Sequence, residues 1–239
     1  MENPVLFEQD NGIAIIILNR PQKRNAINQE MLIHLYNILD KISRQAEIKV
    51  VILTGSGKSF CSGLDLAAIE TDNLFDPRGD GRDFPDIIAD FSKPIIGAIN
   101  GHAITGGLEM ALNLDFLIAA DQAIFADTHV KMGIHPGWGM SQLLQEAIGQ
   151  RMAKQLSLTG EFINAKEAMR LGLINEVVPL NELMPRVKQI ASAILKTKSE
   201  MAPLLLNLIK FRNNTTLKEA LSNERLEFRR FVEDSHLVH

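Results

Sequence analysis

The chain has 239 residues, of which 46% are hydrophobic and 23% charged, which is typical of a globular protein with a sizeable core. Its formal net charge of −4 gives no electrostatic case for nucleic-acid binding, and no apolar run is long enough to cross a membrane. Because the single cysteine, Cys61, excludes a disulfide framework and the N-terminus lacks signal-peptide features, we expect a cytoplasmic protein.

Hydrophobic periodicity predicts alternating strands and helices up to about residue 178, and helices alone beyond it. The expected strands are short and cover 5–9, 13–18, 49–53, 95–99, 115–120, 123–126 and 173–178. The expected helices cover 28–42, 108–112, 140–148, 151–158 and 165–171, with Asn28 and Asn164 as N-caps. Residues 70–90 mix charges with glycine and proline, which indicates a loop with room for one short helix.

This order of elements predicts an α/β core followed by a helical C-terminal part. The pattern alone favours a doubly wound sheet for the core. Beyond residue 180 the apolar residues fall at helical spacing, and they indicate core and subunit contacts. They are Leu183, Val187, Ile190, Ile194, Leu217, Leu221, Leu226 and Phe231.

One apparent nucleotide-binding motif is excluded by its spacing. Residues 55–59 read GSGKS, but a P-loop requires a glycine where Ile52 stands. We therefore expect no nucleotide site there.

A more informative stretch runs from Lys93 to Leu112 and reads KPIIGAINGHAITGGLEMAL. A buried strand ends at a turn, and two glycines then precede a helix whose first turn contains Glu109. Free backbone N–H groups at a helix start suit a developing negative charge, and Gly106 and Gly107 allow close approach to the backbone. A first-turn glutamate is also favoured by the helix dipole alone, so the stretch by itself leaves a structural role open.

Two motifs together resemble signatures of the enoyl-CoA hydratase/isomerase (crotonase) family. Residues 93–109 match its pattern K-P-x-I-A-A-x-N-G-x-A-x-G-G-G-x-E, except that Gly97 stands in place of the first alanine and Thr105 replaces the first glycine of the triplet. Residues 60–66, FCSGLDL, match a second signature. The resemblance implies a spiral of β-β-α turns over residues 1–178, which bind acyl-CoA, with residues 179–239 as a helical oligomerisation region that forms a trimer or a dimer of trimers.

The resemblance also implies the binding groups. The backbone N–H groups of Leu64 and Gly106 correspond to the pair that holds the thioester oxygen in an oxyanion hole. The remaining candidate substrate or CoA contacts are Ser62, Asp65, Leu66, Lys23, Arg24 and Trp138. Lys23 and Arg24 could meet CoA phosphates, although solvated loop charges explain them equally well.

Family hydratases use two glutamates, and this chain matches only one of them. Glu109 corresponds to the first, whereas His129 stands in the place of the second. Histidine exchanges protons near neutral pH, so a catalytic His129 is expected to titrate near pH 6–7. A hydrogen-bonded pocket residue without a chemical role is the alternative, and Asp127 is an acidic residue close by.

The function implied is hydration of a 2-enoyl-CoA in fatty acid metabolism, with Glu109 as the principal acid/base. The alternatives are an enoyl-CoA isomerase, an acyl-CoA thioester hydrolase, or a catalytically weak acyl-CoA-binding member. Coenzyme A is part of the substrate, so no cofactor is expected, and the spacing of His102, His135 and Cys61 predicts no metal site. Because the chain stops at 235–239, where many relatives continue with a basic helix, a CoA contact from that helix is expected to be absent.

Overall fold

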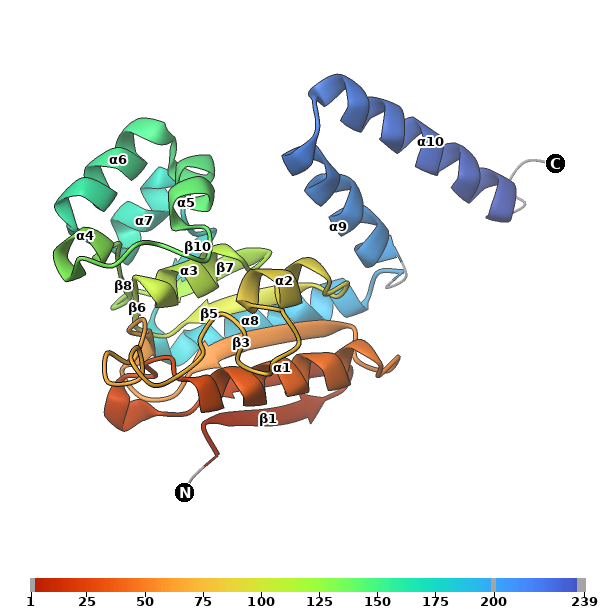
Figure 1. The fold of residues 1–239 in the computed structure, drawn as a ribbon. Helices are drawn as coiled ribbons and strands as arrows, with labels where there is room; N and C mark the ends of the chain where they lie inside the picture. The colour runs from red at the N-terminus through yellow and green to blue at the C-terminus, as the bar shows by residue number, and fades with distance from the viewer. Residues whose placement is uncertain (1–2, 199–200, 236–239) are drawn as a thin grey trace. The chain divides into compact units, whose positions relative to one another are not determined.

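The computed structural model describes residues 3–198 and 201–235, which form two compact units that divide after Lys196 (Figure 1). The first unit contains every strand in the described residues, and the second contains helices alone. The chain end at 236–239, on which the expected loss of a CoA contact depends, lies outside the described residues.

The main sheet of the first unit has six strands in the order β1-β2-β3-β5-β7-β10. All neighbours are parallel except the β1–β2 hairpin. Each later strand is added on the same side, whereas a doubly wound sheet reverses its strand order. The doubly wound prediction is therefore wrong, and the β-β-α spiral is confirmed. The strands are β1 (Val5–Asp10), β2 (Ile13–Leu18), β3 (Val50–Gly55), β5 (Ile95–Ile99), β7 (Phe116–Ala120) and β10 (Glu176–Val178).

A second sheet of four strands, in the order β4-β6-β8-β9, forms the other layer of the spiral. Its strands are only three residues long, too short to show an alternating pattern, which explains why three of them were not predicted. They are β4 (Ser59–Cys61), β6 (His102–Ile104), β8 (Ile124–Ala126) and β9 (Phe162–Asn164). Because β5 leads through a two-residue turn into β6, the chain passes from one sheet to the other directly before the candidate site.

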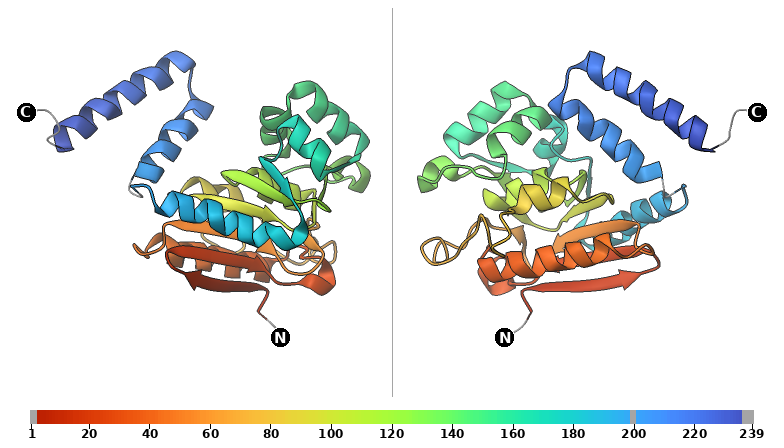
Figure 2. Two further views of the ribbon diagram at one scale, coloured as in Figure 1. Left: turned by 180° about the vertical axis from the view of Figure 1, so that it is seen from behind. Right: turned by 45° about the vertical axis from the view of Figure 1, so that its right-hand side comes forward.

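Helices cover both faces of the main sheet, and its inner strands β2, β3, β5 and β7 are apolar on both sides (Figure 2). In β2, Ile13 and Ile15 join the cluster that contains Leu183 and Val187 of α8 (Leu180–Leu195). Alternate β2 residues face the opposite cluster, which contains the buried side of α1 (Gln29–Ser43). Helix α8 thus belongs to the first unit, although the sequence analysis grouped its residues with the C-terminal helices.

The other helices of the first unit are η1 (Pro21–Lys23), α2 (Phe84–Ala89), α3 (Gly106–Leu112), α4 (His129–Met132), α5 (Met140–Ile148), α6 (Gln150–Thr159) and α7 (Ala165–Leu171). Among them, α3, α5, α6 and α7 lie close to their predicted positions, whereas η1 and α4 were not predicted. Asn28 accepts a hydrogen bond from the Met31 amide and Asn164 from the Glu167 amide, so both predicted caps are confirmed. The loop at 70–90 contains one helix, which Asp83 and Asp86 start as a capping box.

The second unit consists of α9 (Met201–Phe211), the short η2 (Arg212–Asn214) and α10 (Leu217–Ser235). Many of its large apolar side chains are exposed, among them Leu205, Ile209 and Phe228. In the described part of the chain, no helix of either unit has the length and apolar character needed to cross a membrane.

Neighbouring glycines of α3 give a stability test of how this helix packs on β4. A Cβ at Gly107 would lie 2.1 Å from the Cys61 carbonyl oxygen, whereas a Cβ at Gly106 would make an ordinary contact of 3.4 Å with the Ile27 side chain. We expect Gly107→Ala to lower the free energy of unfolding by roughly 1–3 kcal/mol, as overpacking does. Gly106→Ala is the matched control for thermal unfolding. Equal melting temperatures for the two variants would contradict this packing.

Candidate active site

Two backbone N–H groups from distant segments lie close together at the start of α3. Gly63 has φ +96°, and a Cβ there would lie 3.0 Å from the Ile104 carbonyl oxygen and 3.4 Å from the Gly106 nitrogen. Only glycine allows the 63–64 loop to approach the helix start this closely. In the part of the chain that the structure describes, the N–H groups of Leu64 and Gly106 donate no hydrogen bond. Both are available to an acceptor.

The loop that carries Leu64 is fixed from both sides. The Ile27 amide donates to the Gly63 carbonyl at 2.8 Å, and the Asp65 amide donates to the Ile27 carbonyl at 2.8 Å. The Asp65 carboxylate also forms an ion pair of 2.9 Å with Arg20. The two backbone bonds form a parallel β-bridge between Ile27 and Leu64. The Leu64 N–H points away from this bridge, which favours binding of an external acceptor.

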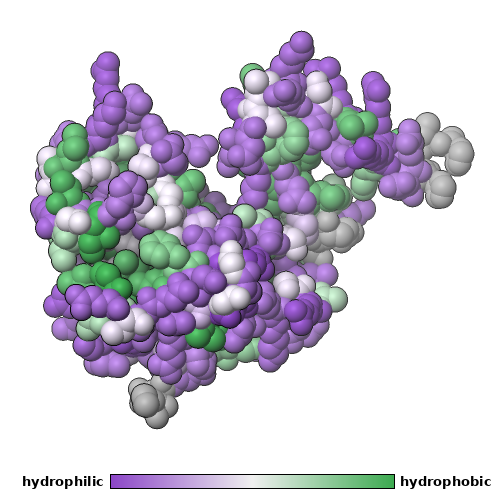
Figure 3. Space-filling view, viewed as in Figure 1, coloured by the Kyte–Doolittle hydropathy of each residue, from purple (hydrophilic) through white to green (hydrophobic). Residues whose placement is uncertain are grey.

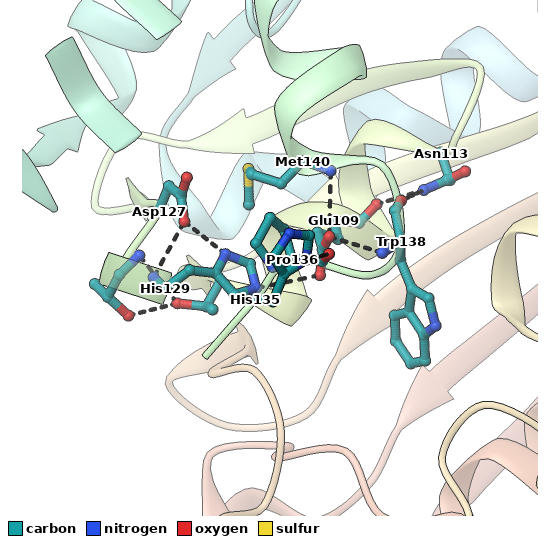
Figure 4. Close-up of polar contacts among 10 residues, drawn as sticks. Glu109, Asn113, Asp127, His129, His135, Pro136, Trp138 and Met140 are labelled. Atoms are coloured by element: carbon teal, nitrogen blue, oxygen red, sulfur yellow. Dashed lines mark hydrogen bonds and ion pairs between the residues drawn. The ribbon is translucent and has the colours of Figure 1, made fainter. Parts of the chain in front are cut away.

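Glu109 is a buried carboxylate, only 3% exposed, on the first turn of α3. Its Oε1 accepts hydrogen bonds from the backbone N–H groups of Trp138 at 2.8 Å and Met140 at 3.2 Å (Figure 4). Asn113 donates to the backbone carbonyls of Glu109 and Trp138, both at 2.9 Å, and so ties α3 to the segment before α5. The carboxylate therefore has one oxygen fixed by backbone and the other, Oε2, directed toward His129.

His129 lies between two carboxylates. Its Nε2 is 3.6 Å from Oε2 of Glu109, and its Nδ1 is 2.7 Å from Oδ1 of Asp127 (Figure 4). The backbone N–H of His129 also donates to Oδ1 of Asp127, at 3.2 Å. The predicted strand ends at Ala126, so these contacts do not come from strand alternation but from a short turn that begins α4.

The contacts around His129 shift the pKa values of His129 and Asp127 in opposite directions. Burial alone would lower the pKa of His129, but the contacts with Asp127 and Glu109 outweigh it and raise the pKa to about 9. Burial alone would raise the pKa of Asp127, but hydrogen bonds from His129 and from the Ser157 side chain hold it below its usual range. At neutral pH the ring is therefore an imidazolium, and the expectation that it titrates near pH 6–7 is corrected.

Thr105, the residue that replaces a family glycine, has an unusual backbone. Its φ of 53° and ψ of −113° are angles that L residues rarely adopt, and such conformations cost on the order of 1–3 kcal/mol. Its hydroxyl lies 2.5 Å from that of Thr128 and accepts a hydrogen bond of 3.2 Å from the Thr128 amide. The start of α3 is thereby bonded to the residue before His129.

The other predicted contact residues lie around this centre in different ways. Lys23 and Arg24 are exposed, and the Arg24 carbonyl accepts a hydrogen bond from the Ser62 amide, so their loop borders the 62–64 segment. Leu66 is 56% exposed. The Trp138 indole is buried against Phe84, with ring centroids 5.7 Å apart. Figure 3 shows an apolar band on the face of the first unit that is turned toward the viewer in Figure 1.

Two further observations concern Cys61 and metal ligands. Burial raises the pKa of the Cys61 thiol to about 12, so it is a poor nucleophile at neutral pH. Among the described residues, no three His, Cys, Asp or Glu side chains lie close enough together to hold a metal ion.

Sequence reasoning missed several residues that hold the site. Buried Asn25 donates to the Ser56 and Ser59 carbonyls, and Asn100 donates to the Gly57 and Ser59 carbonyls, so both amides fix the approach to β4. Nothing in local spacing indicates such long-range contacts. Asp127 was named as a nearby acidic residue, but its hydrogen bonds with His129 were not predicted, although an Asp side chain commonly accepts from the backbone N–H two residues later.

Comparisons with known proteins agree with the fold and the motifs. The enoyl-CoA hydratase/isomerase profile matches residues 8–237. The chain is 39% identical to "Probable enoyl-CoA hydratase 1, peroxisomal" of Arabidopsis thaliana over 91% of this chain and 82% of the relative. It is also 39% identical to the crotonyl-CoA hydratase of Syntrophomonas wolfei, over 83% of this chain and 77% of the relative.

Solved structures give the same result. An enoyl-CoA hydratase of Mycobacterium marinum superposes with a TM-score of 0.89 at 31% identity, covering 97% of this chain and 91% of the other. One from Bacillus anthracis has a TM-score of 0.87 at 32% identity, covering 95% and 90%. The spiral of paired sheets, with a buried carboxylate–histidine pair close to backbone amides that donate no hydrogen bond among the described residues, defines the class as an α/β enzyme. The chain belongs to the enoyl-CoA hydratase/isomerase family.

The raised pKa of His129 predicts a pH-dependent stability. An unfolded histidine titrates near 6.5, whereas His129 in the fold titrates near 9. The stabilisation is therefore fully present below about pH 6.5 and is lost as pH rises through about 9. We expect the wild-type melting temperature to fall by a few degrees more between pH 6 and pH 9.5 than that of His129→Gln. Parallel pH curves for the two proteins would show that His129 is not charged in the fold.

Proposed function

We propose that the protein hydrates a 2-enoyl-CoA, adding water across the double bond next to the thioester. The observation that carries this proposal is the buried pair of Glu109 and His129, whose facing atoms are 3.6 Å apart. Glu109 lies on α3, the helix that starts at the free Gly106 amide, and His129 lies at the start of α4. The names of the relatives support the same reaction, since one is a crotonyl-CoA hydratase and others are enoyl-CoA hydratases.

In the proposed reaction Glu109 takes a proton from water while the water oxygen bonds to the β-carbon. The π electrons of the double bond move toward the thioester oxygen and form an enolate, which the N–H groups of Leu64 and Gly106 stabilise. Each such donor supplies roughly 3 kcal/mol of transition-state stabilisation. The His129 imidazolium then gives a proton to the α-carbon, and the enolate electrons form the new C–H bond.

After product forms, Glu109 is protonated and His129 is neutral. Because Oε2 and Nε2 face each other at 3.6 Å, a small side-chain movement allows the proton to pass back from Glu109 to His129. The pair then carries the same single proton as at the start. This cycle consumes one water and one enoyl-CoA and needs no group beyond the substrate.

The CoA moiety is proposed to lie along the exposed side of the 62–66 loop. Lys23 and Arg24 border that loop and would offer positive charge to its phosphates, while Ser62 and Leu66 would contact the rest of CoA. Asp65 contributes by holding the loop through Arg20. Trp138 contributes through its backbone N–H, which fixes Glu109, and through its ring beside Phe84.

The alternative activities share the oxyanion hole and differ in the product. Isomerisation would move the double bond of a 3-enoyl-CoA, and thioester hydrolysis would release free CoA. Incubation of the purified protein with crotonyl-CoA, followed by chromatography of the products, distinguishes 3-hydroxybutyryl-CoA from free CoA. Binding of acetoacetyl-CoA without turnover would instead favour a catalytically weak binding protein, and no binding at millimolar ligand would contradict the acyl-CoA assignment.

The role of Glu109 is tested by Glu109→Gln. Glutamine keeps an oxygen that can accept from the Trp138 and Met140 amides, but it cannot take a proton from water. We expect kcat to fall roughly 10²–10⁴-fold while acetoacetyl-CoA binds nearly as well as to wild type. Asp115→Asn is the control, because the Asp115 carboxylate accepts a hydrogen bond from the Ile95 amide at the start of β5 and is not part of the proposed site. Full activity in Glu109→Gln would refute the assignment.

His129 is tested by a pair of substitutions. His129→Gln is expected to lower kcat to a similar extent, because glutamine cannot protonate the α-carbon. If His129 only shapes the pocket, the same change alters KM and leaves kcat close to wild type. Hydration that rises in His129→Glu would indicate that the histidine directs the enzyme toward a reaction other than hydration.

We further propose that residues 179–239 mediate assembly into a trimer or a dimer of trimers, in a cytoplasmic setting. The exposed apolar side chains of α9 and α10 support this, because an isolated helical pair would leave them in water. Light scattering is expected to give about three or six times the 26.6 kDa chain mass. A mass equal to one chain would contradict it.

A further inference from the structure

Two threonines at helix starts use their hydroxyls in an unexpected way. Thr105 is the N-cap of α3 and Thr128 the N-cap of α4, and neither side chain caps its own helix. Threonine at an N-cap usually accepts a hydrogen bond from its own helix. Here the two hydroxyls bond to each other, and the Thr105 hydroxyl also accepts from the Thr128 amide.

This hydrogen-bonded pair, which we name the threonine clamp, connects the two segments that carry the acid/base groups. Thr105 directly precedes Gly106 and lies four residues before Glu109, while Thr128 directly precedes His129. The Thr105 amide also donates to the Ala126 carbonyl at 2.8 Å. The clamp thus adds a side-chain link, next to this backbone bond, between the loop of His129 and the helix of Glu109.

The backbone of Thr105 indicates that this arrangement is costly. A glycine would adopt φ 53° and ψ −113° freely, whereas threonine has a branched Cβ that disfavours these angles. Glycine stands at this position in the family pattern that the chain resembles. A strained residue persists where the surroundings or the function require it. The clamp is what the threonine side chain contributes and a glycine could not.

We propose that Thr105 is a positioning residue that holds His129 within reach of Glu109 through its hydroxyl bond to Thr128. The proposal rests on the proposed function, because the positioned group is the one assigned there as the proton donor. Thr105 does not touch the reacting atoms in this account. It acts by fixing the turn in which the imidazole is placed.

Two charged groups face the His129 ring: Glu109 from α3 and Asp127 from the turn that precedes His129. The Ser157 side chain of α6 forms a hydrogen bond with Asp127 and not with the ring. Asp127 holds Nδ1 at 2.7 Å, so it fixes the ring plane. The longer 3.6 Å contact between Nε2 and Glu109 is the one that depends on the spacing of the two segments. Loss of the clamp should affect this contact first.

The test compares Thr105→Gly, which relieves the backbone and removes the hydroxyl, with Thr105→Ser, which keeps the hydroxyl. We expect Thr105→Gly to melt no lower than wild type while its kcat for crotonyl-CoA falls roughly 10- to 100-fold, the range for a misplaced catalytic group. Thr105→Ser should retain kcat within about threefold. Full kcat in Thr105→Gly would overturn the proposal.

A double-mutant cycle shows whether Thr105 acts through His129. If it does, Thr105→Gly should lower kcat little further in a His129→Gln background. The same fold-loss in both backgrounds would contradict the proposal, as would a fully active His129→Gln. Thr128→Val, which removes the partner hydroxyl, should lower kcat in the same direction as Thr105→Gly.

A readout without turnover separates this proposal from the proposed function. The His129 ring can be titrated by NMR, with its signal assigned from the His129→Gln spectrum. Thr105→Gly should lower the pKa of His129 by weakening its contact with Glu109, and Thr105→Ser should leave it near the wild-type value. If wild type fails to hydrate crotonyl-CoA but this shift occurs, the hydration assignment fails and the clamp stands. An unchanged pKa overturns the clamp.

Discussion

The burial of the Glu109 carboxylate is the constraint on which the rest of the site depends. A charge that is 3% exposed is stable only when other groups replace its lost water, and here two backbone amides and one imidazolium do so. These partners come from the 138–140 segment and from the start of α4. The fold has to bring both segments to the first turn of α3, and Asp127 must in turn balance the charge on His129.

The two-sheet spiral meets this requirement by its connections. The chain leaves β5 of the main sheet, enters β6 of the second sheet and turns into α3, so the helix starts between the layers. The β8–α4 turn arrives beside it because β6 and β8 are parallel neighbours. Gly107 lacks a side chain because the Cys61 carbonyl occupies that space, so this glycine serves the packing of α3 and not the approach of a ligand. Gly63, by contrast, brings a second free amide to the helix start.

The helix boundaries and the position of Glu109 were predictable from the sequence, because they depend on residues that are neighbours in the chain. Asn28 and Asn164 cap helices as their spacing indicates, and Glu109 follows its glycines into the first turn of α3. The topology was not predictable from periodicity, because three-residue strands carry no period and a parallel α/β pattern fits several strand orders. The resemblance of residues 60–66 and 93–109 to the family motifs predicted the topology instead. Contacts such as Thr105 with Thr128 join residues 23 positions apart and depend on the finished fold.

The central claim is that His129 works as an imidazolium that donates a proton while Glu109 accepts one. The pH dependence of kcat/KM for crotonyl-CoA hydration tests it most directly. The account predicts a rate that stays high through neutral pH and falls in an alkaline limb near pH 9, where the ring loses its proton, and His129→Gln should lack that limb. A wild-type rate that instead rises as pH passes through 9 would mean that neutral histidine is the active form, and it would contradict the account.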